Sequence, residues 1–531
     1  MRSEKWTDTQ EIKRILVSGD TKQGGPLLYS ENGTHYCDTS ESHVLITGKT
    51  RSGKTSTGVK NYIRNEIEAG HCVVSIDPKG EIMRSVLPYA KNTHNVIILD
   101  FRHPSSSPDR WNPLESPAVL FQSGEPESMD IASTMVSSFA SQLYPTDVNA
   151  DPFWNLSSAT LVEGVIYTLF ELCNVEYCNL SSIIKMMESL ETKIGTSFLL
   201  KEFTTALPEE SLARKAFSSY NNAEGPTRAS IHSVCATGLA PFSRSRGIKK
   251  MLSNGTVRIH ELDVAEAFFV DIILPDESSE VYGSIAGLFV SQVTEHLIRL
   301  AEDKYNGKLP RKTTIFIEEL ASVSGAMKNL PRLMSTALGR NISICLVLQD
   351  PYSQLQDLYG PAKAKAIQAN VGVTIAYSTN DWESLRALSA QCGERELDWD
   401  GRTVNEPLIT PHQLAALNTG CCLILLQNRY KWVTKIPFYS DAFQVNLEEL
   451  SNCVFEEKPL VSPGKIFDME EFVKEKRRLQ IEKMMQTQDS TATTPSPQCS
   501  LSDEEKRQLI AKIQKRIQEE EQRAKKDDTN E

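Results

Sequence analysis

The fold is decided by residues 43–55, which read HVLITGKTRSGKT. A short apolar and β-branched run, 43–47, indicates a buried strand that leads directly into a glycine-containing loop. Helical spacing of apolar residues follows at 57–69, so the loop lies in the strand–loop–helix context that a phosphate-binding loop (P-loop, GxxxxGK[S/T]) requires. The loop consists of Gly48, Lys49, Thr50, Arg51, Ser52, Gly53, Lys54 and Thr55.

Each residue type in this loop pattern has a physical task. The glycines let the backbone wrap around phosphate oxygens, and the N–H groups at the helix start supply partial positive charge. Lys54 is expected to reach the β- and γ-phosphates, and Thr55 is expected to bind Mg²⁺. The sequence therefore predicts a domain that binds ATP with Mg²⁺.

A P-loop needs a carboxylate at the end of a neighbouring strand, and residues 313–319 supply one. The run TTIFI ends in Glu318 and Glu319, where Glu318 would take the metal side and Glu319 would polarise the attacking water. The alternative is an ordinary strand that ends in solvated acids. Aspartate is usual at the first position, and Glu318 is one methylene longer, so the metal geometry and the rate of turnover stay open.

Polar residues flank two further predicted strands. Gln349 ends the strand 342–348, where its amide could sense the γ-phosphate or simply satisfy the end of the strand. Arg340 precedes that strand and is either an arginine finger for a neighbouring subunit or a surface arginine, and the sequence alone favours the second. Asp77 and Lys79 could border the phosphates or form a turn.

Strands that alternate with helices predict an α/β fold with a mostly parallel central sheet. Between about 127 and 252 the pattern becomes helical, which indicates an inserted all-α region. Beyond 450 the chain is charged, with a Thr-, Ser- and Pro-rich stretch at 486–502 that reads as a disordered linker. The expected domains are an N-terminal segment (1–40), a discontinuous nucleotide-binding domain (41–155 and 226–450), an all-α insert (156–225) and a helical, partly disordered tail (451–531).

Composition limits the classes of function. With 531 residues, 40% of them hydrophobic, the chain can bury a large core. A net charge of −12 argues against a static nucleic-acid coat but leaves room for a ring with a basic channel. The 11 cysteines contain no CxxC pair, which indicates reduced thiols in a cytoplasmic protein. Apolar runs are too short to span a bilayer.

Taken in order, several blocks are similar to the type IV secretion coupling proteins, the TraG/TraD-like group. The likeness runs from about residue 40 to 445, and the order of its blocks is more specific than the P-loop alone. The blocks are 48–55, 75–81 (SIDPKGE), 111–114 (WNPL), 151–154 (DPFW), 318–319, 337–343, Gln349 with 353–355 and 359–360, and 408–411 (LITP).

This resemblance implies a RecA-like P-loop motor with an inserted all-α domain, assembled as a homo-hexamer at the inner face of a secretion channel. It implies ATP hydrolysis coupled to export of single- or double-stranded DNA bound by a relaxase, or of protein. By position, the resemblance assigns nucleotide binding or hydrolysis to Lys54, Thr55, Glu318, Glu319 and Gln349. It also favours a role for Arg340 at the interface between subunits of the ring. Family members usually begin with membrane-spanning helices. Without one, a peripheral position through a small membrane anchor protein, or a soluble paralogue, is expected.

Two other functions fit the same residues. One is a docking receptor that binds nucleotide but turns over little ATP, which Glu318 and the missing anchor favour. The other is an FtsK-like DNA translocase, which the long helical insert disfavours. The tail contains two charged helical stretches, 467–485 and 504–526, that either recruit a partner or are solvated.

Overall fold

The structure is a computed structural model of the chain. It describes residues 4–145, 151–194, 197–275, 279–323, 327–399, 402–445, 450, 464–476 and 478–479. The chain divides into two units, Met1–Glu470 and Glu471–Glu531, and the elements below belong to the first unit. The linker and second charged stretch predicted in the tail lie outside the described residues.

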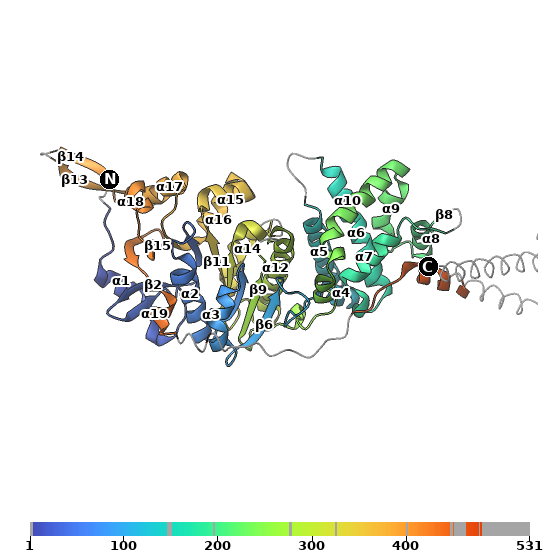
Figure 1. Ribbon diagram of the computed structural model, residues 1–531, viewed down its shortest axis with the longest axis horizontal. Coiled ribbons are helices and arrows are strands. Elements are labelled where there is room, and N and C mark those ends of the chain that lie inside the picture. Colours follow the sequence, from blue (N-terminus) through green and yellow to red (C-terminus); the bar gives the residue numbers. More distant parts are fainter. Residues whose placement is uncertain are drawn as a thin grey trace, which may run out of the picture. The chain divides into compact units, whose positions relative to one another are not determined.

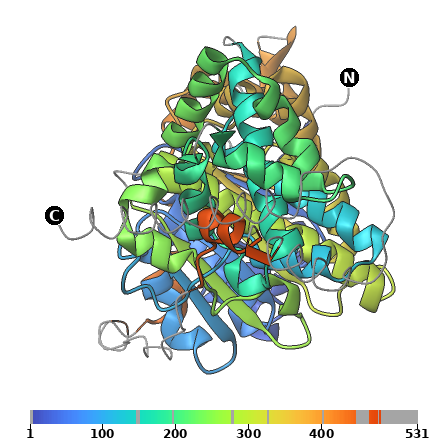
Figure 2. The same cartoon turned by 90° about the vertical axis from the view of Figure 1, so that its right-hand side faces the viewer.

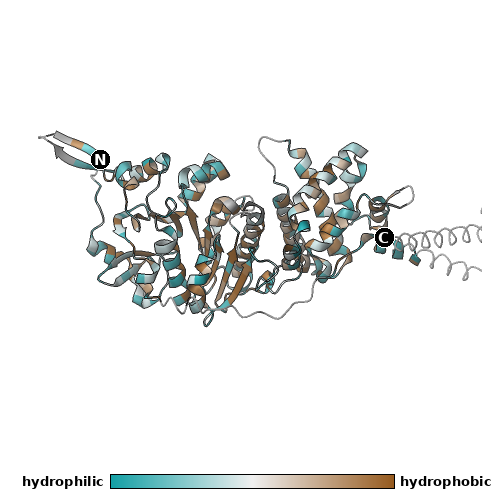
Figure 3. Ribbon diagram, viewed as in Figure 1, coloured by the Kyte–Doolittle hydropathy of each residue, from teal (hydrophilic) through white to brown (hydrophobic). Residues whose placement is uncertain are grey.

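The centre of the first unit is a nine-stranded sheet (Figure 1). From β12 to β6 all neighbours are parallel, and β15 and β16 extend one edge antiparallel. The strands are mostly apolar (Figure 3) and buried, as expected of a parallel sheet covered on both faces. In spatial order they are β16 (Tyr430–Lys435), β15 (Cys421–Leu426), β12 (Val371–Ala376), β4 (His43–Thr47), β11 (Ile342–Leu348), β10 (Thr313–Glu318), β5 (Cys72–Asp77), β9 (Phe268–Ile273) and β6 (Asn95–Asp100).

The P-loop leads into a continuous helix, η2 (Lys54–Val59) followed by α2 (Lys60–Glu68), which packs on the sheet. Tyr62 of α2 meets Phe316 of β10 edge to face, with ring centroids 4.8 Å apart. Helix α3 (Glu81–Ala90) covers the same face through Ile82 and Val86. This core is what holds the P-loop helix against the strands that carry the other predicted site residues.

Helices occupy the chain between β6 and β9 (Figure 2, cyan to green). They are α4 (Glu115–Gln122), α5 (Pro126–Leu143), α6 (Pro152–Leu172), α7 (Leu180–Ser189), α8 (Leu199–Ala206), α9 (Leu212–Asn222), α10 (Gly225–Arg244) and α11 (Arg246–Met251), with η3 (Val175–Tyr177), η4 (Ile259–Glu261) and the short pair β7 (Lys193–Ile194) and β8 (Ser197–Phe198). Helix α6 is buried on most of its surface and forms the centre of this helical layer. The boundaries 156 and 225 fall within α6 and at the start of α10, and the exact division into domains stays a prediction.

The second half of the chain supplies the remaining elements of the sheet's surroundings. They are α12 (Ser279–Lys304), α13 (Leu320–Val323), α14 (Leu330–Ala337), η6 (Leu338–Arg340), α15 (Pro351–Tyr359), α16 (Pro361–Ala369), α17 (Trp382–Cys392), the hairpin β13 (Glu394–Trp399) and β14 (Arg402–Pro407), α18 (Pro411–Ala415) and α19 (Tyr439–Phe443). Within the described residues, no helix combines the length and the apolar character needed to span a bilayer.

The N-terminal segment is more ordered than its turn-rich sequence predicts. After α1 (Thr9–Ile15) the chain forms an antiparallel sheet in the spatial order β1 (Val17–Ser18), β3 (Thr34–Cys37) and β2 (Leu27–Glu31), with η1 (Gly19–Thr21) between β1 and β2 in the chain. Asn32 and Gly33 join β2 to β3, and both have positive φ, 52° and 79°. Asn-Gly is the dipeptide that a tight hairpin favours, and this signal could have revealed the hairpin from the sequence.

Candidate nucleotide site at the carboxyl ends of the strands

The parallel registers bring the predicted motifs to one edge of the sheet. Leu348 of β11 pairs with Thr47 of β4, and Val347 pairs with Glu318 of β10. The P-loop, Glu318 and Gln349 therefore follow three adjacent strands at the same level. This edge is where open α/β sheets bind ligands.

The P-loop backbone uses conformations that favour glycine. Gly48 and Gly53 have φ of 151° and 106°, and Arg51 is left-handed at 65°. A Cβ on Gly48 would lie 2.7 Å from the Cβ of Tyr377 and 2.8 Å from Ser52 Oγ, which no side chain could tolerate without movement. The glycine pattern thus reflects both positive φ and close packing.

Backbone hydrogen bonds from two other segments hold the P-loop in place. One segment follows β12, and the other is the turn before β15. The Lys49 N–H donates to Ser378 O at 2.8 Å, and the Gly420 N–H donates to Ser52 O at 3.0 Å. The hydroxyls of Thr57 and Tyr377 are 2.6 Å apart. Sequence reasoning missed Tyr377 and Gly420 as supports of the site, since no motif marks them.

Two polar groups of the loop are placed to contact a bound anion. The Lys54 Nζ donates to Gly48 O, across the mouth of its own loop. The buried Ser52 Oγ has no hydrogen-bond partner in the described residues. Burial lowers the pKa of Lys54, although Glu318, Glu319 and Asp350 lie close enough to oppose that shift. An anion bound in the loop would satisfy both groups.

Thr55 and Glu318 meet, as the predicted Mg²⁺ pair requires. The Thr55 Oγ1 donates to Glu318 Oε1 at 2.5 Å. Burial raises the pKa of Glu318 to about 7, and the negative charge of Asp77 adds to the shift, while Thr55 and Lys54 oppose it. A hydroxyl and a carboxylate are the oxygen ligands that Mg²⁺ prefers, so Thr55 and Glu318 would hold the ion, and its charge would favour the ionised carboxylate.

Glu319 follows directly in the left-handed conformation, with φ of 63°. A non-glycine residue in this region costs energy, and such residues gather at functional sites. The turn separates Glu319 from the direction of β10 and places it at the same sheet edge as the P-loop, before α13 begins at Leu320.

Gln349 is held through its backbone. Its carbonyl accepts from Thr47 Oγ1 at 3.1 Å, and its N–H donates to Gln354 Oε1 at 3.1 Å. Asp350 continues the contact by accepting from Thr379 Oγ1 at 2.6 Å. In the described part of the chain the side-chain amide of Gln349 makes no hydrogen bond, which suits a group that meets a ligand.

Arg340 is not brought to this site within the chain. It precedes β11, whose seven residues span about 23 Å, so it lies at the opposite, amino-terminal edge of the sheet. Its Nη1 donates to Thr336 O at 3.0 Å, and Nη2 pairs with Glu302. Arg340 could contact a nucleotide only if that nucleotide were bound to a neighbouring copy of the chain.

Two roles were open for Asp77, bordering the phosphates or forming a turn, and in the structure it forms a turn. Its carboxylate accepts from four backbone N–H groups at the start of α3, those of Lys79, Glu81, Ile82 and Met83, at 2.7–3.2 Å. It therefore fixes the turn beside Glu318 rather than offering free oxygens to a ligand.

The sheet also has a cavity of about 640 Å³, but at the amino-terminal edge. Its lining includes Gln23, His71, Arg311 and Lys312. No residue of the P-loop and neither Glu318 nor Gln349 lines it, so the predicted chemistry and this cavity are separate features.

Comparisons with known proteins agree with this architecture. The family model for type IV secretory system conjugative DNA transfer matches residues 1–462. A solved structure of the plasmid coupling protein TrwB with the ATP analogue ADPNP has a TM-score of 0.62 at 16% identity, covering 82% of this chain and 94% of that one. Another, of TrwB with ADP and Mg²⁺, has a TM-score of 0.58 at 16% identity, with the same coverage.

At that identity the likeness establishes the fold, which is a RecA-like P-loop NTPase fold. The sequence has no match among the curated proteins. The family match extends over most of the chain, from the N-terminal segment through the sheet and its helical insert. The chain therefore belongs to the type IV secretory system conjugative DNA transfer family, the coupling proteins.

Proposed function

We propose that this coupling protein is an ATP-driven motor that passes DNA, carried by a relaxase, to a type IV secretion channel. The observation that supports it most is the contact of Thr55 with Glu318 at 2.5 Å, beside Lys54 and a buried Ser52 hydroxyl without a partner. These groups are the ones that a nucleotide and its metal ion would complete.

ATP with Mg²⁺ fits the residues present. The loop N–H groups and Lys54 would hold the phosphates, and Thr55 with Glu318 would hold the metal ion. One of the similar TrwB structures is a complex with ADPNP and another is a complex with ADP and Mg²⁺, which supports the same ligands here. Bound Mg²⁺ supplies charge neutralisation for phosphoryl transfer.

The remaining site residues take roles that follow from their positions. Glu319, in its left-handed conformation at the strand end, orients and polarises the attacking water. The amide of Gln349, free in the described structure, responds to the γ-phosphate. Arg340, about 23 Å away along β11, acts only in trans, in a homo-hexamer where it meets a neighbour's nucleotide.

The partners are a DNA strand with its relaxase, and components of the secretion channel. Family membership supports this class of partner. A small membrane protein would hold the ring at the inner face of the membrane. Whether DNA or protein is the main cargo is decided by which of the two stimulates ATP hydrolysis.

A second function has one observation in its favour. Glu318 stands where aspartate is usual, and its side chain is one methylene longer, which changes the metal geometry on which turnover depends. A receptor that binds ATP and presents substrates without turning it over would tolerate this arrangement.

The test is ATP hydrolysis by the full chain with and without single-stranded DNA. We expect DNA to stimulate hydrolysis, and Lys54→Ala to remove it, because the phosphate contact is lost. Lys91→Ala, an exposed lysine on α3's end, is the matched control and should hydrolyse ATP normally. Stoichiometric ATP binding without turnover under all conditions would favour the receptor instead.

A further inference from the structure

One stretch of this acidic chain has no acidic residue. Across 225–260 there is no Asp or Glu, although acids make up 69 of the 531 residues, about one in eight. The same stretch holds six cations, Arg228, Arg244, Arg246, Lys249, Lys250 and Arg258. A local positive charge within a chain of net charge −12 is a feature that fits recognition of an anion.

The cations divide into paired and unpaired groups. Arg228 pairs with Glu191 at 3.4 Å, and Arg258 pairs with Glu115 at 3.2 Å. Arg244, Arg246 and Lys249 form no ion pair among the described residues. Together with Lys250 they surround the break between α10 and α11, and we call these four residues the basic junction.

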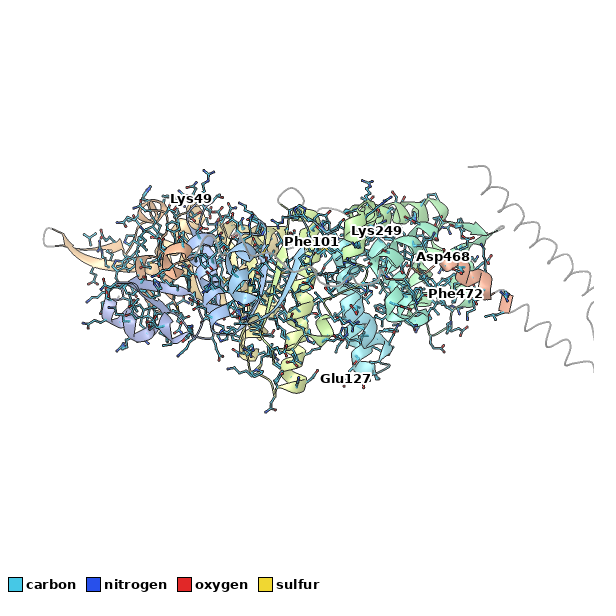
Figure 4. The ribbon with its side chains drawn as sticks, turned by 60° about the horizontal axis from the view of Figure 1, so that its bottom comes forward. Lys49, Phe101, Glu127, Lys249, Asp468 and Phe472 are labelled. Atoms are coloured by element: carbon cyan, nitrogen blue, oxygen red, sulfur yellow. The ribbon has the colours of Figure 1, made fainter. Side chains whose placement is uncertain are left out.

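Close packing holds the basic junction at the carboxyl-end edge of the sheet. A Cβ on Gly247 would lie 2.6 Å from Ser105 Oγ, so α11 sits directly on the loop that follows β6. Lys250 Nζ donates to Ser105 O at 3.3 Å. Figure 4 labels Lys249 of α11 and Phe101, the first residue of this loop. The basic junction thus borders the edge at which the P-loop lies.

The same loop also links the basic junction to the neighbourhood of Glu318. Arg102 pairs with Asp100 at 2.7 Å and donates to Lys79 O at 3.1 Å, in the turn that Asp77 fixes. The acid nearest to this loop, Asp100, is therefore already engaged. The distance across the sheet from β6 to β10, which passes β9 and β5, is three strand spacings, or about 15 Å.

Exposed aromatic side chains lie in the same helical layer. Phe153 and Trp154 open α6 with 46% and 36% of their surface exposed, and their rings are 5.0 Å apart. Asn155 bonds Pro145 O at 2.5 Å, and Tyr144 OH donates to Cys235 O at 2.9 Å, so α6 begins beside the middle of α10. The rings at the start of α6 and the basic junction at the end of α10 and in α11 therefore lie along the same helix, α10, and basic and aromatic groups together are the combination that holds single strands.

We propose that the basic junction binds the phosphate backbone of a single DNA strand, with Phe153 and Trp154 stacking on its bases. The inference rests on the proposed function and adds the place where the strand is held. The unpaired cations provide charge complementarity to phosphate, and the exposed rings select unstacked bases over a closed duplex. A strand bound there lies beside the sheet edge that contains the ATP site.

The test measures binding of fluorescent 30-nucleotide oligo-dT to the full chain by anisotropy, over a series of salt concentrations. Arg246→Gln with Lys249→Gln should lower the slope of log affinity against log salt by about 1.4, because each lost phosphate contact removes about 0.7. Lys201→Gln with Lys215→Gln removes the same charge from exposed sites on α8 and α9 and should leave the slope unchanged. Both pairs should bind a fluorescent ATP analogue like the wild type.

A second substitution tests the aromatic half. Trp154→Leu should weaken oligo-dT binding about tenfold without changing the salt slope, since stacking releases no counterions. Trp382→Leu is the control, because Trp382 is similarly exposed, at 39%, on α17. Trp154→Leu should weaken binding of a 30-base-pair duplex less than binding of the strand.

The outcomes separate this inference from the function it rests on. If the wild type binds oligo-dT and the Arg246/Lys249 variant has an unchanged slope, the basic junction is a solvated surface and the inference is wrong alone. If the wild type hydrolyses ATP but binds no DNA, DNA is not the cargo and the inference fails with it. Equal weakening of strand and duplex by Trp154→Leu would overturn the choice of a single strand.

Discussion

Two glutamates at opposite edges of the same sheet, the buried Glu66 and the half-buried Glu318, differ in which groups neutralise or hydrogen-bond their carboxylates. Glu66 accepts from the Gly25 N–H at 2.8 Å and lies 3.2 Å from Lys312 Nζ and 2.6 Å from His71 Nδ1. Burial would raise the pKa of Glu66, but these partners hold it down at about 2. Glu318 has the Thr55 hydroxyl, and its pKa rises to about 7.

One helix joins the two sites, because η2 and α2 run from Lys54 to Glu68 and carry Thr55 near one end and Glu66 near the other. At the amino-terminal edge the charges neutralise one another, so burial of Glu66 serves the fold. At the carboxyl-end edge the polar groups have fewer hydrogen-bond and ionic partners, which lowers the stability of the fold. A bound ligand would supply those partners. The difference favours the carboxyl-end edge, rather than the cavity at the amino-terminal edge, as the place where a ligand binds.

Removing each glutamate should therefore have unequal effects, and this is the largest expected difference. Glu66→Ala leaves Lys312 and the Gly25 N–H buried without their partner, so unfolding should be easier by about 3–5 kcal/mol. Glu318→Gln, in the absence of nucleotide, should change stability by less than about 1 kcal/mol, because the wild-type carboxylate is itself poorly satisfied. Urea unfolding midpoints of the two variants measure this, and equal losses would contradict the comparison.

The loss of folding stability at low pH should come mainly from protonation of Glu66. Its pKa is lowered on folding from 4.5 to about 2, so its contribution is complete above pH 4.5 and is lost as the pH falls toward 2. The full contribution is about 3 kcal/mol on this shift. Unfolding midpoints measured between pH 5 and pH 2 should fall in the wild type and fall less in Glu66→Gln. A parallel decline in both would assign the acid sensitivity to other carboxyls.

The sequence predicted the carboxyl-end edge well because its parts are local. Gly48 to Thr55 and the pair Glu318 and Glu319 are each a strand running into a loop, and parallel strands bring their carboxyl ends to one edge. The α/β class followed from the alternation of strands and helices. The helical layer was anticipated from its 3.6-residue period, since that pattern does not depend on distant contacts.

The amino-terminal edge could not be predicted in the same way. Gly25, Glu66, His71 and Lys312 meet only after the sheet has formed, and no spacing in the chain marks them. Tyr377, directly after β12, contacts the Thr57 hydroxyl beside the P-loop from more than 300 residues away along the chain. Arg340 also lies at this edge, where its guanidinium pairs with Glu302.

Nucleotide should stabilise the carboxyl-end edge without changing the other. At a hundredfold excess over its dissociation constant, ATP with Mg²⁺ adds about 2.7 kcal/mol to the wild type. Lys54→Ala and Glu318→Gln should lose most of this gain, while Lys91→Ala should retain it. Melting temperatures with and without nucleotide measure the gain. A full gain in Lys54→Ala would mean that the P-loop is not the binding site.

The smallest expected difference concerns two glycines with positive φ. Gly33, in the β2–β3 turn, has φ of 79° and nothing within 4 Å of an added Cβ, so Gly33→Ala costs only the left-handed strain, about 1 kcal/mol. Gly48→Ala adds a clash with Tyr377 and Ser52 at 2.7 and 2.8 Å, and should cost about 1–2 kcal/mol more. Gly48→Ala should also bind a fluorescent ATP analogue less tightly, and Gly33→Ala should not. If the two variants have the same melting temperature and the same affinity for the analogue, the P-loop is flexible rather than pre-formed. The polar groups without partners at that edge then do not mark a site prepared for phosphate.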